Sequence, residues 1–189
     1  VSVNETIESL TFTFVSDSRG GGDTDQISSC QGEIETNFVN QIACQMANGP
    51  FWNSKRMDKA NALGYNQSEI TTLASIVQME QQIKFDEHSK IAGLYINRLK
   101  SNMKLQADPT VKFANKLPKL RRVLNRHLKY DSPYNTYLYK GLPPGPICIP
   151  DDKTIDAVLN YVKHDYIYMC AQPTFSGYHN FANSYSNHM

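Results

Sequence analysis

Apolar side chains recur at alternating or helical spacing along most of the chain, and this pattern predicts the order of its elements. Residues 10–15 alternate and are rich in β-branched and aromatic side chains, so they predict a strand. A glycine-rich loop follows over 16–25. Apolar residues at four-residue steps predict a helix over 33–47. The sequence Asn48-Gly49-Pro50 would end it, because proline lacks a backbone donor.

The clearest amphipathic stripe lies further along the chain. Four apolar residues at i, i+3, i+4 and i+7 spacing share one helix face, namely Ile70, Leu73, Ala74 and Val77. Asn66 or Ser68 could cap this helix, and Glu69 lies in its first turn, where the helix dipole favours a negative charge. Three residues beyond Val77 the same stripe reaches Glu80, so we expect a carboxyl group on the buried face.

The rest of the chain combines helices, long irregular segments and two short strands. Helices are predicted over 51–63, 87–100, 117–128 and 151–163, a turn at Asp108-Pro109, a loop over 131–150, and strands over 165–171 and around 179–181. The helix over 117–128 is basic and is expected to present a solvated face. This mixture indicates an α+β fold.

Composition and charge exclude several classes of function. Apolar residues make up 40% of the 189 residues and charged residues 20%, which allows a core of ordinary size and argues against disorder. A net charge of +1 gives no basis for nucleic-acid binding. No apolar run approaches the ~20 residues of a membrane-spanning helix, and the first residues lack the features of a signal peptide. Because the chain begins with Val, we expect it to be part of a larger or exported protein.

The cysteines and histidines do not form a metal-binding pattern. The four cysteines contain no CxxC pair, and the five histidines show no HExxH or similar spacing, so we expect no metal. Cys30 and Cys44 are the better candidates for a disulfide, while Cys148 and Cys170 could equally be small buried apolar residues. His179 is expected to form hydrogen bonds near a substrate cleft or near the core.

Glu80 is the strongest candidate for chemistry. A carboxyl on an apolar helix face is desolvated, which raises its pKa toward the value that a general acid needs near neutral pH. The alternative is a glutamate that reaches solvent at a fraying helix end, or that pairs with Arg98 or a lysine. The pattern alone favours this structural alternative.

The loop over 131–150 is the second candidate. Its prolines and glycines stiffen a segment that would otherwise lose much entropy on ordering, and long stiff loops often line a site. Its Tyr, Asn and Thr side chains suit a sugar, because rings stack on sugar faces and amides and hydroxyls bind its hydroxyl groups. A rigid surface loop whose tyrosines pack on the core is an equal alternative.

Several motifs, taken in order, resemble those of one known family. They are Leu73-Ala74-Ser75-Ile76-Val77 with Glu80, Asn97-Arg98-Leu99, Leu105-Gln106-Ala107-Asp108-Pro109-Thr110-Val111, SPYNTY over 132–137, GLPPGPI over 141–147, Asp165-Tyr166-Ile167-Tyr168 and Gly177-Tyr178-His179-Asn180-Phe181. Together they resemble the MltG (YceG-like) family of endolytic murein transglycosylases over about residues 51–189. Motifs of this length in one order are highly specific.

The resemblance implies a lysozyme-like helical catalytic module with a small β-sheet, which cleaves the MurNAc-GlcNAc β-1,4 bond of peptidoglycan glycan strands without a cofactor. Glu80 matches the family's catalytic glutamate, which would protonate the glycosidic oxygen and then act as base while the muramyl C6 hydroxyl closes onto C1. The product would be a 1,6-anhydromuramyl end. The residues that match further family positions and are expected to bind substrate or orient Glu80 are Gln106, Asp108, Tyr134, Asn135 and Thr136. Asn97 and Arg98 also match, and a bracing role suits them at least as well.

Some positions depart from the family pattern. The family usually has a second acid two residues before the catalytic one and a Thr after it, where this chain has Gln78 and Gln81. The spacing from Glu80 to the next helix is also about one residue longer, which keeps Glu87 as a rival for the catalytic role.

The resemblance also carries expectations about organisation and location. Residues 1–50 are predicted to be a divergent segment that could form a small α+β lobe, and residues 51–189 a YceG-like catalytic domain. We expect a periplasmic location, with an inner-membrane anchor in the full-length protein, and peptidoglycan strands and cell-wall synthesis enzymes as partners. The alternatives are a hydrolytic muramidase and an inactive peptidoglycan-binding module.

Overall fold

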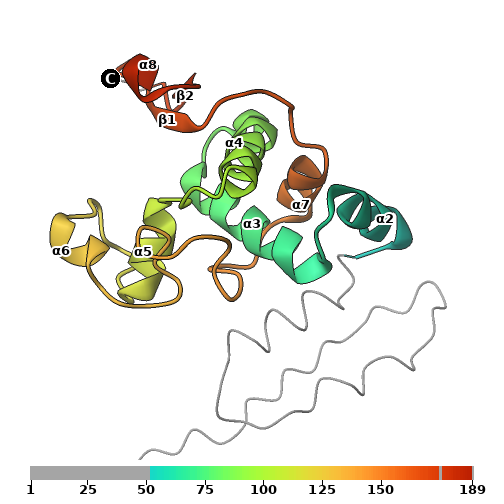
Figure 1. The fold of residues 1–189 in the computed structure, drawn as a ribbon, viewed down its shortest axis with the longest axis horizontal. Helices are drawn as coiled ribbons and strands as arrows, with labels where there is room; N and C mark the ends of the chain where they lie inside the picture. The colour runs from blue at the N-terminus through green and yellow to red at the C-terminus, as the bar shows by residue number, and fades with distance from the viewer. Residues whose placement is uncertain (1–51, 175, 189) are drawn as a thin grey trace, which may run out of the picture. The chain divides into compact units, whose positions relative to one another are not determined.

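The computed structural model describes residues 52–174 and 176–188, which belong to the unit Glu33–Met189. Its elements in chain order (Figure 1) are α2 (Ser54–Leu63), α3 (Gln67–Glu80), the short 3-10 helix η2 (Phe85–Glu87), α4 (His88–Lys100), α5 (Asp108–Ala114), α6 (Asn125–Leu128), α7 (Asp152–Leu159), β1 (Tyr168–Ala171), β2 (His179–Ala182) and α8 (Tyr185–His188). The predicted strand over 10–15, the helix over 33–47, the small lobe and a Cys30–Cys44 disulfide lie outside the described residues. The described residues have an α+β fold, as predicted.

The central helix of the core is α3. It begins with a capping box: Asn66 Oδ1 accepts a hydrogen bond from the Glu69 backbone N–H at 2.9 Å, and Glu69 Oε2 accepts one from the Asn66 N–H at 2.8 Å. Every residue from Ile70 to Val77 is buried. Such a helix needs packing on several sides, and α3 contacts α4, α5 and α7.

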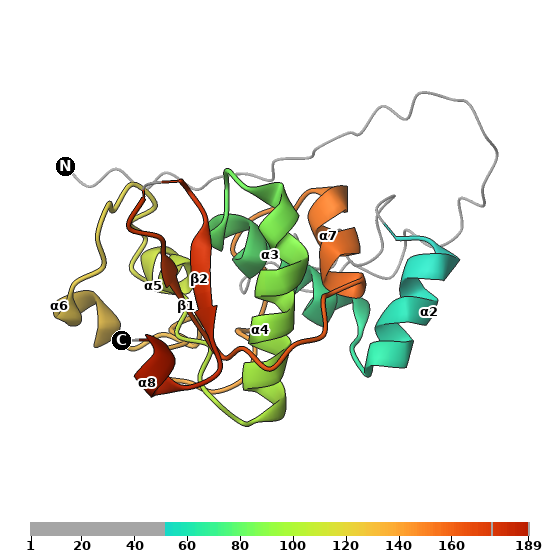
Figure 2. The same cartoon turned by 90° about the horizontal axis from the view of Figure 1, so that it is seen from above.

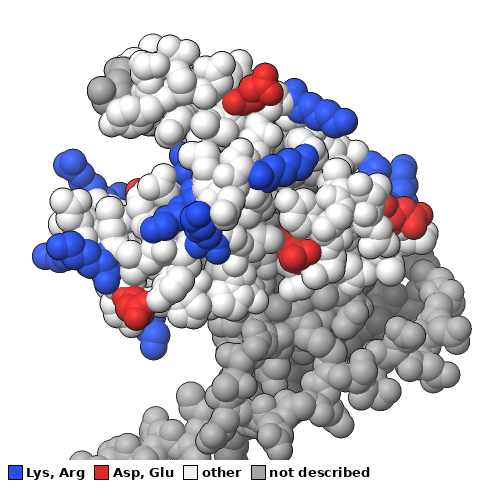
Figure 3. Space-filling model, in the orientation of Figure 1, with Lys and Arg blue, Asp and Glu red and all other residues white. Residues whose placement is uncertain are grey.

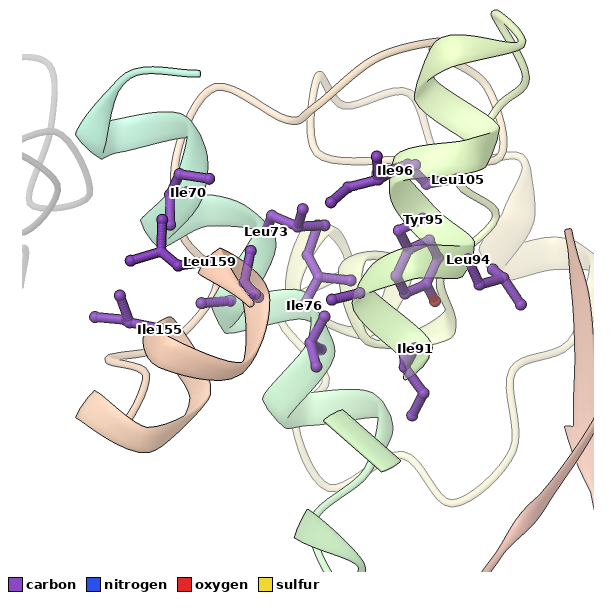
Figure 4. Close-up of a cluster of buried hydrophobic side chains, with 14 of the residues drawn as sticks. Ile70, Leu73, Ile76, Ile91, Leu94, Tyr95, Ile96, Leu105, Ile155 and Leu159 are labelled. Carbon is purple, nitrogen blue, oxygen red and sulfur yellow. The ribbon is translucent and has the colours of Figure 1, made fainter. Parts of the chain in front are cut away.

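The core lies where α3, α4 and α7 meet. Figure 4 shows Leu73 and Ile76 of α3, Ile91 and Tyr95 of α4, and Ile155 of α7 within one cluster of side chains. Each of these five residues is at most 2% exposed. Burying one Leu or Ile side chain stabilises a fold by roughly 1.5–3 kcal/mol, so this cluster fixes the relative positions of the three helices.

The segment after α7 runs closely along α4. The Val162 N–H donates to the Ser89 carbonyl at 3.0 Å, and a ring nitrogen of His164 lies 2.8 Å from the Lys90 carbonyl oxygen. Gly93 faces this segment, since a Cβ on it would lie 2.4 Å from the Val162 carbonyl oxygen. The absence of a side chain at position 93 therefore permits the close approach.

The small sheet consists of β1 and β2, which pair antiparallel. The register places Tyr168 opposite Ala182 and Ala171 opposite His179. The hairpin lies on the side of α4 away from α7 (Figure 2), and α8 packs on both strands. This arrangement brings the end of the chain beside α4.

Several predicted elements differ from the structure, two of them because of proline. Asp108-Pro109 does not form a turn but begins α5, because proline fits the first turn of a helix, where its missing N–H is not needed. Of the helix predicted over 117–128 only Asn125–Leu128 forms, since Pro118 disfavours the helical conformation of the residue before it. The helix that follows Asp151 ends at Leu159 instead of residue 163.

Charge is unevenly spread over the described surface. On the face in Figure 3, Lys and Arg side chains gather over the part that holds α5 and α6. The exposed basic residues of segment 116–129 are Lys116, Lys119, Arg121, Arg122, Arg126 and Lys129. Within the described ranges, no helix has the length and apolar character needed to cross a membrane.

Replacing Gly93 with Ala should destabilise the fold, although Ala is the better helix former by about 1 kcal/mol. The added Cβ would also meet His164 Nε2 at 2.8 Å, so the segment after α7 would have to move. We expect the free energy of unfolding in urea to fall by about 2–3 kcal/mol. Gly64→Ala is the control: its φ of 77° disfavours Ala by about 1 kcal/mol, but nothing lies within 4 Å of its Cβ. A stabilised Gly93→Ala variant would contradict the close packing.

Candidate active site

Glu80 ends α3 and is half-buried. The hydroxyl of Tyr95, in α4, donates a hydrogen bond of 2.7 Å to Glu80 Oε1. Tyr95 is 2% exposed, and its ring belongs to the core drawn in Figure 4. A rigid core residue therefore holds the carboxyl from the protein side.

Glu80 lines a cavity of about 270 Å³ whose walls come from segments far apart in the sequence. The other lining residues are Leu94, Tyr95 and Arg98 from α4, Leu105, Gln106 and Asp108 from the segment that leads into α5, Tyr137 from the long loop, and Met169, Cys170, Ala171 and His179 from the hairpin. Carboxyl, hydroxyl, amide, guanidinium and imidazole groups thus share one space. Such a combination of a concave site and convergent polar groups is typical of a binding or catalytic site.

The pKa of the Glu80 carboxyl is raised from 4.5 to about 7, and burial is the largest cause. Within this net shift, the negative charge of Asp108 also raises the pKa, whereas the Tyr95 hydrogen bond, the Lys112 charge and the Asp108 backbone N–H lower it. The cavity keeps the group half-exposed, so a ligand can reach it. A half-buried carboxyl with a pKa near 7 can both donate and accept a proton at neutral pH.

Asp108 is the second carboxyl of the cavity. The Tyr137 hydroxyl donates a hydrogen bond of 2.7 Å to Asp108 Oδ1, and both residues are half-buried. Burial and the neighbouring Asp108 carboxylate raise the pKa of Tyr137 well above its usual value. Tyr137 therefore remains protonated and acts as a donor that fixes one oxygen of Asp108.

Arg98 braces two walls of the cavity. Its Nη1 donates to the carbonyls of Lys104 and Leu105 and to Gln106 Oε1 at 2.8–3.1 Å, and its Nε donates to the Ile167 carbonyl at 2.6 Å. Gln106 has a φ of 53°, which is uncommon for a residue with a side chain, and its side chain is exposed. The bracing role predicted for Arg98 is confirmed by these contacts with backbone carbonyls.

Asn97 acts in the same way on the neighbouring segment. Its Nδ2 donates to the carbonyl oxygens of His164 at 2.6 Å and Tyr166 at 3.1 Å. Asn97 therefore has a structural role, although neither of these partners lines the cavity.

The other predicted site residues do not line the cavity. Asn135 is fully buried, and its amide donates to the carbonyls of Leu128 and Tyr130 at 3.0 and 2.8 Å. Thr136 is 2% exposed, and its hydroxyl accepts a hydrogen bond from the Ala107 N–H. The Tyr134 ring packs on Phe113, with ring centroids 4.8 Å apart. This trio shapes the loop that presents Tyr137, and only Glu80, Gln106 and Asp108 of the predicted set share the cavity.

Glu87 occupies a different environment from Glu80. It is 7% exposed, its Oε2 lies 2.8 Å from His179 Nδ1, and it is not among the residues that line the cavity. Glu80 forms no ion pair with Arg98 or any lysine among the described residues. Of the two carboxyls, only Glu80 faces the cavity.

The sequence interpretation missed two tyrosines of the site. Tyr95 lies on the buried face of α4, and because a buried tyrosine hydroxyl needs a partner, its pairing with a buried carboxyl of α3 could have been inferred. Tyr137 gave no such signal beyond its place in the SPYNTY motif. His179 does lie at the cavity and is hydrogen-bonded, as expected.

The two described cysteines are free thiols in different settings. Cys148 is half-buried, and burial raises the pKa of its thiol to about 11, in line with an unreactive residue. Cys170 is exposed and lines the cavity, so it is not the small buried residue that the sequence allowed. Among the described residues, no group of three or more His, Cys, Asp or Glu side chains could hold a metal ion.

Known proteins provide independent information about this chain. The sequence model of the YceG-like family matches residues 28–189. An endolytic murein transglycosylase of Bacillus subtilis is 45% identical over 104 residues, which are 55% of this chain and 28% of the relative. One from Streptococcus pneumoniae strain R6 is 33% identical over 144 residues, 70% of this chain and 26% of the relative.

A solved structure is also similar. A Listeria monocytogenes protein described as yceG-like superposes with a TM-score of 0.65 at 35% identity, over 71% of this chain and 43% of its own. The chain therefore spans about a quarter of the length of the two transglycosylases and less than half of the solved structure.

Replacing Glu80 with Gln should stabilise the fold above pH 7 and have little effect near pH 4. The pKa of about 7 in the folded state exceeds that of the unfolded carboxyl, so the folded chain keeps a proton that the unfolded chain releases from about pH 4.5 upward. The free energy of unfolding of the parent therefore decreases between these pH values. The full pKa shift corresponds to a change of about 3 kcal/mol in the free energy of unfolding. Because solvent reaches the carboxyl through the cavity, we expect Glu80→Gln to exceed the parent in stability by about 1–2 kcal/mol above pH 7.

Urea denaturation of parent and variant at pH 4.5, 6 and 8 would measure this difference. Asp58→Asn, at an exposed carboxylate of α2, is the matched control and should show no such trend. A Glu80→Gln variant with the same stability difference at all three pH values would contradict the raised pKa.

Proposed function

This chain belongs to the YceG-like family, and we propose that it is the catalytic part of an endolytic murein transglycosylase. The proposed reaction cleaves the MurNAc-GlcNAc β-1,4 bond within peptidoglycan glycan strands and leaves a 1,6-anhydromuramyl end. The observation that carries the proposal is the position of Glu80, whose carboxyl lines the cavity and has a pKa raised to about 7. Two relatives named endolytic murein transglycosylase support it. The lysozyme-like arrangement of the helices is part of the same proposal.

In the first step Glu80 acts as general acid. Its protonated carboxyl donates a proton to the glycosidic oxygen as the bond from that oxygen to C1 of the muramyl residue breaks, and the bonding electron pair leaves with the oxygen. A positive charge develops at C1. The raised pKa keeps much of the acid form available near neutral pH.

In the second step the Glu80 carboxylate acts as general base. It takes the proton from the muramyl C6 hydroxyl while O6 bonds to C1, which closes the anhydro ring and restores the acid. No water is consumed, so a single carboxyl group can serve both steps, whereas hydrolytic glycosidases generally use two. The 2.7 Å hydrogen bond from Tyr95 stabilises the carboxylate between the steps.

The other groups of the cavity would hold the glycan. The Tyr137 ring offers a surface for stacking on a sugar ring, and the exposed amide of Gln106 offers a donor and an acceptor for hydroxyls. The Asp108 carboxylate would favour the positive charge that develops at C1. We propose a positioning role for Tyr134, Asn135 and Thr136, which shape the loop from outside the cavity.

A hydrolytic muramidase is the second candidate, and one observation favours it. Asp108 lies in the same cavity as Glu80 and could activate a water molecule, as the second carboxylate of a hydrolytic glycosidase does. The hydrogen bond from Tyr137 occupies only one of its oxygens. The nature of the new sugar end separates the two reactions.

Location and partners remain predictions that follow from the proposed substrate. Peptidoglycan lies outside the cytoplasmic membrane, so we propose a periplasmic site of action, with an inner-membrane anchor in the full-length protein. Enzymes that synthesise cell wall are the proposed partners. An inactive peptidoglycan-binding module would need the cavity to hold the glycan, but it would not need Glu80 as an acid.

Digestion of purified peptidoglycan, followed by mass spectrometry, tests the reaction. The parent chain should release fragments with 1,6-anhydromuramyl ends, which are one water lighter than reducing ends, and Glu80→Gln should release about 10³-fold less or none. Reducing ends would indicate the muramidase. Glycan that is bound but not cleaved by the parent would indicate a binding module. Cleavage by the variant at the parent rate would exclude Glu80 as the acid.

Tyr95→Phe should move the descending limb of the pH profile of kcat/KM upward by about one pH unit. The Tyr95 hydroxyl lowers the pKa of Glu80, so its loss raises that pKa and keeps the acid protonated to higher pH. Phe keeps the ring in the core. Tyr139→Phe is the control, because the Tyr139 hydroxyl binds Asp131 and does not line the cavity. A limb that stays in place or moves down would exclude the assigned hydrogen bond.

A further inference from the structure

The Glu87 carboxylate binds three donors in a nearly closed environment. Oε1 accepts the His179 backbone N–H at 3.0 Å, and Oε2 lies 2.8 Å from His179 Nδ1 and accepts from Gln81 Nε2 at 2.7 Å. Two of these three contacts come from His179. The carboxylate therefore fixes both the backbone and the ring of this residue.

This arrangement determines which ring nitrogen of His179 can bind something else. A carboxylate only accepts hydrogen bonds, so Nδ1 must carry the proton that lies between it and Glu87 Oε2. Nε2 has no hydrogen-bond partner among the described residues, and it is not fully buried. His179 lines the cavity that contains Glu80. Nε2 is thus the atom of the ring that is available to a ligand.

The support of His179 begins at the residue next to Glu80. Gln81 is 3% exposed, and its Oε1 accepts the backbone N–H groups of Ile83 and Lys84 at 3.1 and 2.9 Å. Its Nε2 donates to the Gly177 carbonyl at 2.9 Å as well as to Glu87. The loop after α3 and the turn before β2 are therefore joined through one side chain. A ring held in this way loses little freedom when it binds a ligand.

We propose that His179 is a substrate-binding residue of the cavity and that Glu87 is its positioning residue. Nε2 forms a hydrogen bond with a hydroxyl or acetamido group of the glycan, and Glu87 holds the ring so that this nitrogen faces the cavity. The inference rests on the proposed function, because the glycan strand is the ligand that it names. It adds a polar contact from the hairpin to the one that Glu80 provides from α3.

Two variants of His179 separate ligand contact from structural support. The amide of Asn lies where Nδ1 lies and can still bind Glu87, whereas the amide of Gln reaches the position of Nε2. With soluble glycan strands of defined length as substrate, His179→Asn should raise KM about five- to tenfold with kcat within about twofold of the parent. His179→Gln keeps a polar group near the position of Nε2 but loses the contact of Nδ1 with Glu87, so it should raise KM clearly less than His179→Asn does.

Further variants test the positioning role. Glu87→Gln should raise KM in the same direction as His179→Asn, because an amide NH2 would replace one of the oxygens that face three donors. His188→Asn is the matched control, since His188 does not line the cavity. Equal KM values for the Asn and Gln variants of His179, or a loss confined to kcat, would overturn the assignment of Nε2.

Nitrogen NMR of the histidine rings gives a reading that does not depend on turnover or on the folding of a His179 variant. In Glu80→Gln protein labelled with ¹⁵N-histidine, glycan strands should shift the Nε2 resonance of His179 and leave its Nδ1 resonance nearly in place. If glycan binds and the Nε2 resonance does not move, the inference about His179 fails while the proposed function stands. If the parent does not cleave glycan and Glu80→Gln does not bind it, the proposed function itself fails.

Discussion

Glu80 is held where its charged form is unfavourable, and the rest of the site is arranged around this constraint. Burial along α3 removes water from one side of the carboxyl, and the end of a helix carries partial negative charge that opposes a carboxylate. Asp108 adds a further negative charge. The Tyr95 hydroxyl offsets part of this cost without removing it. The result is a carboxyl whose two protonation states are close in free energy near neutral pH, at the expense of some stability of the fold.

The cavity walls keep their positions because side chains bind backbone carbonyls. Arg98 joins the segment before α5 to the segment before β1, and Asn97, one residue earlier on α4, binds two carbonyls of the segment before β1. Asn135 closes the loop that carries Tyr137 by binding the carbonyls of Leu128 and Tyr130. A guanidinium or amide that bridges two carbonyls fixes irregular backbone, which lacks the regular hydrogen bonds of a helix or sheet. Most of the wall is irregular, so these few bridges determine its shape.

The parts that could be predicted from sequence are those decided by local spacing. The stripe from Ile70 to Val77 and the start at Asn66 specify α3, and continuing the stripe places Glu80 on the buried face. The sequence cannot show whether a polar side chain in a loop faces a ligand or the backbone. Asn135 and Thr136 have the chemistry of sugar-binding residues, yet they satisfy neighbouring backbone groups. Proline has a similar ambiguity, since Pro109 fits both a turn and the first turn of a helix.

The two departures from the family pattern around Glu80 have structural explanations. Gln78 Oε1 accepts the Asp151 N–H at 2.6 Å and the Thr154 hydroxyl at 3.1 Å, so it serves as an acceptor at the start of α7, a role that a carboxylate could also fill. Gln81 spans from the loop after α3 to Glu87 and Gly177, a distance that the shorter side chain of threonine does not cover. Both glutamines therefore support the backbone around Glu80.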